Sequence, residues 1–466
     1  MSTTFPSHVF REYDVRGLVA TELTPAFAET LGRAYGAFLL EKNSGARALV
    51  LGRDHRLSSS DLAAAFSRGA RTHGLEVIDI GVVPTPLTYF AAQVLPVDGL
   101  CMITGSHNPP EYNGFKIGVG KSTLAGPEVQ QLKERALAVH ARELTAAAGA
   151  KTGRDTKFNI NDFYQSLIVQ TLGQAKKKLK VVCDAGNGTG GLAGPALLRA
   201  LGHEVIELFC ELDGTFPNHH PDPTVEKNLL DLQKAVREHK ADLGIAWDGD
   251  ADRLGAVDEN GTILWGDQLL LLFARDLLAE VPGAAIVGEV KCSQTLYDDI
   301  AEKGGRPIMW KAGHSLIKSK MKEEHALLAG EMSGHLFFAH RWYGFDDGIY
   351  SSARLLELVA RDGRKMSEML SDVPKTYASP EIRFDFAEEK KFRAVEIAKE
   401  RLRKAGKTIE VDGVRVIIDG AWGLVRASNT QPLLVLRWES TSEEGLKTIQ
   451  GLIEGTVERI REELGG

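Results

Sequence analysis

Three short segments of this chain hold side chains whose types and spacing could do chemistry, and the first surrounds a serine. Residues 104–116 read TGSHNPPEYNGFK, and Ser106 follows an apolar run over 99–103 that predicts a buried strand. The Gly, Asn and Pro residues predict a rigid surface turn. An isolated serine in such a turn usually only caps the backbone. A turn at the end of a buried strand is, however, where α/β proteins place reactive groups.

The second segment, residues 248–253, reads DGDADR and places three carboxylates at alternate positions. Asp248, Asp250 and Asp252 would repel one another strongly unless a cation neutralised them. A hard divalent ion with oxygen ligands, such as Mg²⁺, fits this set. The alternative is an acidic, solvated turn. The apolar run over 243–247 predicts a strand that carries the loop out of the core, which favours the ion.

The third segment reads GEMSGH over 330–335, and a fourth polar loop follows later in the chain. If the GEMSGH segment is extended, Glu331, Ser333 and His335 point to one side. A carboxylate and a hydroxyl at that spacing suit two neighbouring sugar hydroxyls, whereas His335 alone could be structural. Residues 426–430 read RASNT. An arginine with two hydroxyls and an amide can clamp a phosphate, and an ordinary loop with a surface arginine is the alternative.

These segments need strands to position them, and the chain repeats one order of elements three times. An apolar strand and its polar loop are followed by a helix-length segment, a second strand, and a third strand that leads into a motif. The first strands are expected over 48–54, 181–187 and 286–291, and the third over 100–103, 243–247 and 326–329. This alternation predicts mostly parallel sheets with helices on both faces. If the copies share an orientation, the three motif loops converge on one cleft.

The last segment of the chain has a different pattern. A break near 372–380 with two prolines precedes two β-rich runs around Asp412-Gly413, which predict a hairpin. Residues 442–464 predict a closing helix, so this part forms a small α+β domain. We therefore predict four domains: 1–155 with Ser106, 156–260 with the three aspartates, 261–372 with GEMSGH, and 373–466 with RASNT.

Composition limits the class of protein. The chain has 466 residues, with 43% hydrophobic and 26% charged side chains, as in soluble globular enzymes. A net charge of −7 gives no support to a nucleic-acid partner. Four cysteines without a C-x-x-C pair predict reduced thiols rather than disulfides or a zinc site. No apolar run reaches membrane-spanning length and the N-terminus lacks a secretory pattern, so we predict a cytoplasmic protein with no membrane partner.

Together the motifs resemble the α-D-phosphohexomutase superfamily, and within it the bacterial phosphomannomutase/phosphoglucomutase group, over essentially the whole chain. In that resemblance TGSHNPPEYNGFK is similar to the phosphoserine loop, DGDADR to the metal loop, GEMSGH to the sugar loop and RASNT to the phosphate loop. Residues 10–17, 214–228 and 311–318 match as well. The implied fold is three related α/β domains with mixed sheets around a central cleft plus a smaller C-terminal α+β domain.

The resemblance also implies roles for individual residues. Ser106 would be the phosphorylated residue and a metal ligand, beside Asp248, Asp250 and Asp252, which would hold Mg²⁺. The groups implied near the reacting oxygens, with acid and base unassigned, are Lys116, Arg253 and His335. The implied substrate contacts are Tyr13, Arg16, His107, Lys291, His314, Glu331, Ser333, Arg426, Ser428, Asn429 and Thr430. Glu331 and Ser333 would take the sugar's 3- and 4-hydroxyls, and the last four residues the phosphate that is not transferred.

The activity implied is interconversion of hexose 6-phosphate and hexose 1-phosphate through a hexose 1,6-bisphosphate, with a phosphosugar as the only partner and the chain a monomer or weak dimer. Mannose and glucose differ at C2, away from the 3- and 4-hydroxyls, so both sugars stay open. Phosphoglucosamine mutase is the nearest rival, but its relatives resemble SASHNP and usually carry Gln where Met332 stands. A silent sugar-phosphate-binding protein and a metal-dependent phosphatase also stay open.

Overall fold

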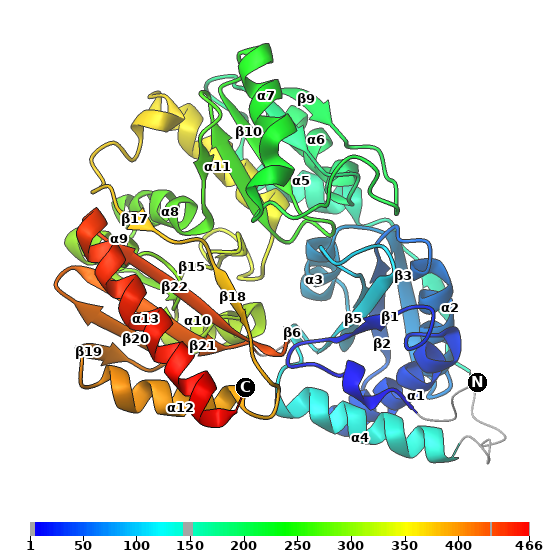
Figure 1. Ribbon diagram of the computed structural model, residues 1–466. Coiled ribbons are helices and arrows are strands. Elements are labelled where there is room, and N and C mark those ends of the chain that lie inside the picture. The colour runs from blue at the N-terminus through cyan, green and yellow to red at the C-terminus, as the bar shows by residue number, and fades with distance from the viewer. Residues whose placement is uncertain (1–4, 143–151, 429–430, 466) are drawn as a thin grey trace. The chain divides into compact units, whose positions relative to one another are not determined.

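The computed structural model describes residues 5–142, 152–428 and 431–465, and the chain divides into two compact units. Unit 1 comprises Met1–Leu269 and Ser333–Met369, and unit 2 comprises Leu270–Met332 and Leu370–Gly466. Figure 1 shows the elements of each unit. Two of the expected substrate contacts, Asn429 and Thr430, lie outside the described residues.

The first sheet of unit 1 carries the serine loop. Its strands are β1 (Val15–Leu18), β2 (Ala48–Arg53), β3 (Glu76–Val82), β4 (Gly99–Ile103), β5 (Tyr112–Val119), β6 (Ser122–Thr123) and β7 (Asp155–Lys157). They lie in the order β1-β5-β4-β2-β3-β7, with β6 beside β5. Strands β2, β3, β4 and β7 are parallel, whereas β5 runs antiparallel to β4 and β1.

Helices cover both faces of this sheet. They are α1 (Pro25–Lys42), α2 (Ser59–Arg71), α3 (Thr85–Val94) and α4 (Pro127–Arg142), with a 3₁₀ turn at Ser7–Val9. Along β2, Leu49 and Leu51 enter the core that also contains α1, α2 and α4 residues, whereas Val50 between them does not belong to it. This alternation follows from the two-residue period of a strand. Helix α3 contacts β2 and β4.

The second sheet of unit 1 carries the aspartate loop. Its strands are β8 (Lys180–Asp184), β9 (Glu204–Leu208), β10 (Leu243–Trp247), β11 (Leu254–Asp258) and β12 (Ile263–Leu264), in the order β12-β11-β10-β8-β9. Strand β8 is parallel to β9 and β10, and β11 is antiparallel to β10. Its helices are α5 (Asn161–Leu172), α6 (Gly190–Ala200), α7 (Leu230–His239) and α11 (Gly348–Asp362), with 3₁₀ turns at Glu226–Leu229 and Met366–Glu368. Strand β16 (Leu336–Phe338) also lies in unit 1.

Unit 2 contains a parallel set of three strands and an antiparallel C-terminal sheet. Strand β13 (Ala285–Glu289) lies between β14 (Arg306–Trp310) and β15 (Leu328–Gly330), with α8 (Gly266–Glu280), α9 (Gln294–Glu302) and α10 (His314–Glu324). The second sheet has the order β17-β22-β21-β20-β19, with β18 beside β22. Its elements are β17 (Tyr377–Ala378), β18 (Ile382–Asp385), β19 (Lys407–Ile409), β20 (Val414–Ile418), β21 (Ala421–Ala427), β22 (Leu433–Ser440), α12 (Lys391–Leu402) and α13 (Glu443–Leu464).

Several sequence expectations are confirmed and one needs correction. The hairpin around Asp412-Gly413 forms between β19 and β20, and the closing helix is α13 with Ser442 as its N-cap. The sheets of unit 1 are mixed, which confirms the fold that the resemblance implies and corrects the mostly parallel sheets that the alternation alone predicts, because β5 and β11 each return antiparallel after a motif loop. The condition that the GEMSGH segment be extended is not met, because residues 332–334 form a turn with Gly334 at φ +89.

The expectation of reduced cysteines is confirmed, because all four are free thiols. Cys101, Cys183 and Cys292 are buried, and Cys210 is partly buried. Burial raises the pKa of Cys101 and Cys183 well above the ordinary thiol value, and raises that of Cys210 to about 12. Among the described residues, no helix is both long and apolar enough to cross a bilayer.

Candidate active site

Ser106 lies three residues beyond the end of β4, in a backbone conformation that has to be held in place. Its φ is +49, in the left-handed region that L-residues other than Asn and Asp rarely adopt. Its N–H donates to Thr104 Oγ1 at 2.8 Å. Its hydroxyl lies 3.1 Å from His107 Nδ1 and donates to Asp248 Oδ2 at 3.0 Å. The serine hydroxyl is therefore presented directly to the aspartate loop.

Arg56 holds the serine loop in this shape. The guanidinium is buried and donates to the carbonyl oxygens of Ser106, Asn108, Pro109 and Tyr112, at 2.9, 2.5, 2.6 and 3.0 Å respectively. Asp54 lies 3.2 Å from Arg56 Nε and accepts the Gly105 N–H at 3.0 Å. Sequence reasoning missed this pair. The feature of the sequence that could have indicated it is the pair of charged residues directly after the apolar run of β2. Strand β2 pairs with β4, the strand that leads to Ser106.

The three aspartates are fully buried at the end of β10, and each offers an oxygen within 4.8 Å of the others. Asp250 Oδ2 accepts from Thr85 Oγ1 at 2.5 Å, while Oδ1 of Asp250 and Oδ1 of Asp252 accept no hydrogen bond within the described residues. Burial and then the two neighbouring carboxylates raise the pKa of Asp248 well above its usual value. Buried carboxylate oxygens without donors in a repelling group of three are the donor set of a hard divalent cation.

Lys116 supplies the positive charge beside these carboxylates. Its ammonium is buried on β5 and donates to Asp250 Oδ2 at 2.8 Å and to Asp252 Oδ2. Burial opposes the charge, but the two carboxylates outweigh it and raise the pKa of Lys116 well above its usual value. Lys116 also lowers the pKa of Asp252, against the effect of burial. Lys116 is therefore a cation held between two of the predicted metal ligands.

The serine and aspartate loops meet through their backbones at Gly249. A Cβ at this position would lie 2.4 Å from the carbonyl oxygen of Ser106, so only glycine permits the approach. On its other side the Gly249 carbonyl accepts the Thr189 N–H at 3.0 Å. Two loops that are 142 residues apart in the sequence thus form one site within unit 1.

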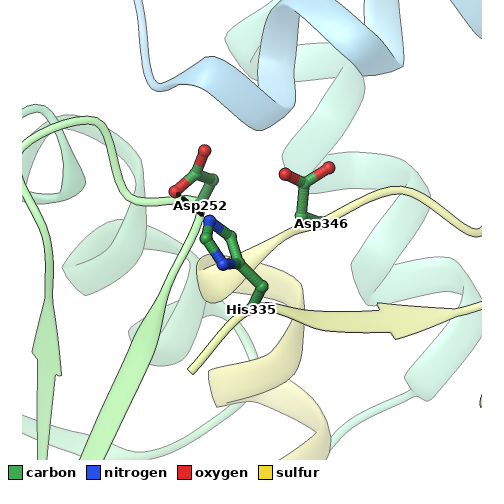
Figure 2. Close-up of side chains that lie close together, drawn as sticks. All are labelled: Asp252, His335 and Asp346. Atoms are coloured by element: carbon green, nitrogen blue, oxygen red, sulfur yellow. Dashed lines mark ion pairs between the residues drawn. The ribbon is translucent and has the colours of Figure 1, made fainter. Parts of the chain in front are cut away.

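His335 extends this site from the GEMSGH turn, as Figure 2 shows. The ring is 7% exposed, and its Nε2 lies 3.4 Å from Asp252 Oδ1 and 3.4 Å from Arg253 Nε. Its Nδ1 shares a hydrogen bond of 2.8 Å with Ser333 Oγ. Asp346 is fully buried and completes a second group, with Asp252 and His335, whose ligand atoms lie within 4.8 Å of one another. Asp346 was missed in the sequence, where it stands in an Asp-Asp-Gly run before α11.

The remaining predicted residues of unit 1 lie around the serine loop and before β1. Arg16 on β1 donates to Asn108 Oδ1 at 2.8 Å and pairs with Asp14 at 2.6 Å. His107 is adjacent to Ser106, and burial, followed by the charges of Arg253 and Arg16, lowers its pKa well below the usual value. Tyr13 is partly buried in the bend before β1. The structure therefore places Arg16 and His107 next to the serine loop.

Unit 2 holds a second set of predicted residues. Lys291 follows β13, and its Nζ lies 2.9 Å from Glu381 Oε2 and 3.6 Å from Glu289 Oε1. Burial alone would lower its pKa, but these two carboxylates raise it. Lys291 in turn lowers the pKa of Glu381 to about 2. Arg426 on β21 donates from Nε to Asp412 Oδ2 at 2.9 Å. The three acidic partners were missed in the sequence because no local pattern links them to these cations.

Hydrogen bonds to the amides before α10 connect Glu331 with Asp412, the partner of Arg426. Asp412 also accepts the Ala312 N–H at 3.1 Å, and Glu331 Oε1 accepts the Gly313 N–H at 2.6 Å. These amides precede His314, the first residue of α10. Ser428, directly after β21, donates its N–H to Leu433 O at 3.0 Å. The predicted cations, carboxylate and hydroxyl of unit 2 thus lie on, or shortly after, the carboxyl ends of β13, β15 and β21.

Comparisons with known proteins agree with this layout. Family models described as phosphoglucomutase/phosphomannomutase alpha/beta/alpha domains I, II and III match residues 7–143, 160–261 and 265–377, and the C-terminal domain of that family matches 381–454. A phosphomannomutase/phosphoglucomutase of Pseudomonas aeruginosa is 46% identical over 98% of this chain and 97% of its own. A phosphoglucomutase of Neisseria meningitidis is 45% identical over 97% and 96%.

A solved structure has a similar fold. It is a phosphoglucomutase/phosphomannomutase family protein of Burkholderia thailandensis, 39% identical, with a TM-score of 0.90 over 98% of both chains.

Proposed function

The chain belongs to the phosphoglucomutase/phosphomannomutase family, and on that premise we propose that it is a phosphohexomutase. It interconverts hexose 6-phosphate and hexose 1-phosphate of mannose, glucose or both, through a phosphoserine and a 1,6-bisphosphosugar. The observation that carries this proposal is the 3.0 Å hydrogen bond from Ser106 Oγ to Asp248, inside a buried group of three aspartates. The names of the relatives favour this activity over phosphoglucosamine mutase.

In the proposed reaction, an oxygen of the hexose bonds to phosphorus while the bond from phosphorus to Ser106 Oγ breaks. The proposed acceptor of the sugar's hydroxyl proton is His335, whose Nε2 lies beside Asp252. Lys116 is held as an ammonium by Asp250 and Asp252, so it can donate a proton but not accept one. Mg²⁺ held by the aspartates would supply charge compensation for the transferring phosphoryl group. In the second half of the reaction, Ser106 Oγ bonds to the phosphorus at the other end of the bisphosphosugar while the bond from that phosphorus to the sugar oxygen breaks. This step restores the phosphoserine.

Both units are proposed to contribute to substrate recognition. Arg426 and Ser428, with Asn429 and Thr430, would grip the phosphate that is not transferred, because an arginine fork and hydroxyls match phosphate geometry. The proposed sugar contacts are Lys291, His314 and Glu331 from unit 2, with Tyr13, Arg16, His107 and Ser333 from unit 1. We also propose the domain limits 1–155, 156–260, 261–372 and 373–466, a cytoplasmic location, and a chain that is a monomer or weak dimer.

The test of the nucleophile is Ser106→Ala, with Ser122→Ala on exposed β6 as the matched control. Turnover is measured with mannose 1-phosphate, glucose 1-phosphate and glucosamine 6-phosphate in coupled assays. Ser106→Ala should lose nearly all turnover while the control keeps it, and near-normal turnover by Ser106→Ala would refute the assignment. Faster turnover of the glucosamine substrate would favour the rival mutase, and stoichiometric release of inorganic phosphate would favour a phosphatase.

The test of the cation is calorimetry with Mg²⁺ alone. Asp250→Asn removes the negative charge but keeps an oxygen that can accept from Thr85 Oγ1 and Lys116 Nζ, so it should weaken Mg²⁺ binding while the chain stays folded. Asp242→Asn, at the opposite end of β10, is the matched control. Equal Mg²⁺ affinity in Asp250→Asn and the wild type would count against the aspartates as the metal loop.

A further inference from the structure

Unit 1 contains a second cavity, outside the site formed by the serine and aspartate loops. It has a volume of about 220 Å³ and lies where the chain leaves α5, where it leaves α6, and along α11. Its buried apolar lining comes from Leu201, Ala353 and Ala360, with the partly buried Leu172 beside them. A cavity of roughly 150 Å³ with apolar walls is already large enough to hold benzene. The space therefore accommodates a ring or a short hydrocarbon body, and it is too small for a polypeptide segment.

Among the polar side chains that line this space, the buried one is a histidine. His203 is 6% exposed and lines the cavity. Its Nδ1 accepts the Leu179 N–H at 3.3 Å. Burial lowers the pKa of His203 to about 4, so the ring is neutral at pH 7 and its single proton is on Nε2. Within the described residues its Nε2 has no hydrogen-bond partner, so this N–H remains available to a ligand in the cavity that the ring lines.

The rim of the cavity is positively charged. Along α11, the residues Ala353, Glu357, Ala360 and Arg361 follow the spacing of a single helix face. The Glu357 carboxylate is already paired with Arg341 at 2.8 Å and with Arg354 at 3.1 Å. Lys176 and Arg361 line the opening, where Arg361 is exposed. An apolar floor, one neutral N–H donor and two cations at the opening match a molecule with an apolar body and an acidic group.

Two helices join this cavity to the aspartate loop. Helix α6 ends beside the cavity at Ala200, and the Thr189 N–H just before it donates to Gly249 O at 3.0 Å. Helix α11 lines the cavity with its second half, and its first residue, Gly348, donates its N–H to Ala251 O at 3.1 Å. Trp247, directly before the aspartates, donates to Ser352 Oγ at 2.9 Å. A helix of this length spans about 22 Å as a rigid rod.

We propose that this cavity is a binding site for a small amphipathic carboxylate or phosphate monoester, and that its occupant alters the aspartate loop through α6 and α11. The acidic group of the ligand accepts the His203 Nε2–H and lies near Lys176, while its apolar body packs on Ala353 and Ala360. Rigid elements carry a free energy of coupling between two sites when they have two arrangements that both sites bias, so the coupling part of the proposal requires such a shift of α6 or α11. The coupling part rests on the proposed function, since it takes the aspartate loop as the Mg²⁺ loop.

The binding part is tested by calorimetry or NMR titration of the whole chain with 2-naphthoate, compared with 2-naphthalenemethanol, which lacks the charge. A molecule of about 13 non-hydrogen atoms should reach a dissociation constant near 1 mM at an ordinary ligand efficiency. Lys176→Gln should weaken naphthoate binding about threefold to tenfold, and Lys178→Gln, which removes the same charge two residues away, should not. Phenyl phosphate replaces naphthoate in a parallel titration to separate carboxylate from phosphate.

Ala360→Leu fills the cavity and should abolish binding. If that variant fails to fold, the Lys176 and Lys178 pair still decides the outcome. Absence of saturable binding of both anions up to about 10 mM would overturn the site, and so would equal affinity for Lys176→Gln and the wild type.

The coupling part is tested by measuring Mg²⁺ affinity with and without saturating naphthoate. By linkage, any change in Mg²⁺ affinity must equal the change that Mg²⁺ causes in naphthoate affinity. A shift of about fivefold or more in both is the expected result. Naphthoate binding with unchanged Mg²⁺ affinity would refute the coupling alone. Failure of the wild type to bind Mg²⁺ would instead refute the proposed function.

Discussion

Arg56→Met is the most informative perturbation of the serine loop, because one buried guanidinium holds four carbonyl groups of that loop. Methionine keeps most of the volume and removes every donor. Each buried carbonyl left without a partner costs roughly 1–3 kcal/mol, although water entering the loop recovers part of it. Breaking a buried, hydrogen-bonded charge costs about 3–5 kcal/mol in comparable cases. We therefore expect the substitution to destabilise the ordered form of the loop at 104–112 by about 3–4 kcal/mol.

That cost should appear as lost activity rather than as global unfolding. If the ordered loop that positions Ser106 becomes less stable by about 3–4 kcal/mol, the transition state that requires this loop rises in free energy by the same amount. This lowers kcat/KM by about a hundredfold to a thousandfold. Hydrogen exchange should show faster exchange of the 104–116 peptide, with α1 and α2 unchanged. The matched control is Arg53→Met, which removes a 2.9 Å pair with Asp79 from a partly exposed position on β2. A partly exposed pair contributes at most about 1 kcal/mol.

The reasoning would be refuted by an Arg56→Met variant with both kcat/KM and exchange of residues 104–116 at wild-type values. Equal decreases of kcat/KM in Arg53→Met and Arg56→Met would also contradict it. Such a result would show that the loss of a positive charge, and not the loss of the carbonyl contacts, lowers the activity.

Three further outcomes are expected. Gly249→Ala should lower kcat with little change in melting temperature, because the new Cβ would lie 2.4 Å from the Ser106 carbonyl oxygen, and normal kcat would exclude that contact as a requirement. Arg426→Ala should raise KM more than it lowers kcat, and a loss in kcat alone would remove it from phosphate binding. For His203, the folded pKa of about 4 lies below the ordinary 6.5. The unfolded chain therefore binds more protons between these values, and the free energy of unfolding falls by at most about 3 kcal/mol as pH drops through that window. His203→Asn, which can still accept the Leu179 N–H, should flatten urea-derived stability over that range, and an unchanged pH profile would contradict the assignment.

The motif loops could be predicted from the sequence because their signals are local. A short apolar run followed by Gly, Asp or Asn places a polar loop at a strand end, and Ser106 and the three aspartates occupy such positions. The return of β11 after the aspartate loop was harder to anticipate. An apolar run over 254–258 fits either a parallel or an antiparallel partner, and its direction is set by the short turn at 248–253.

The supporting side chains could not be found in this way because their partners are remote in sequence. Arg56 lies 50 residues or more from the four carbonyl groups that it holds. Asp412 and Glu381 pair with cations on other elements of unit 2. The GEMSGH segment is not extended for a local reason, because Gly334 has a positive φ and turns the chain. A glycine at that position was the available sign of a turn.

The unreactive state of the native thiols has a practical consequence. A thiol with a pKa of about 12, as at Cys210, is ionised in about one molecule in a hundred thousand at pH 7, and the thiolate is the form that alkylating reagents attack. Cys101, Cys183 and Cys292 are in addition shielded from reagents by burial. Single cysteines introduced at exposed positions, one in each unit, would then be labelled selectively on the otherwise native chain. Spin or dye pairs attached there could report the separation between the units in solution as substrate is added.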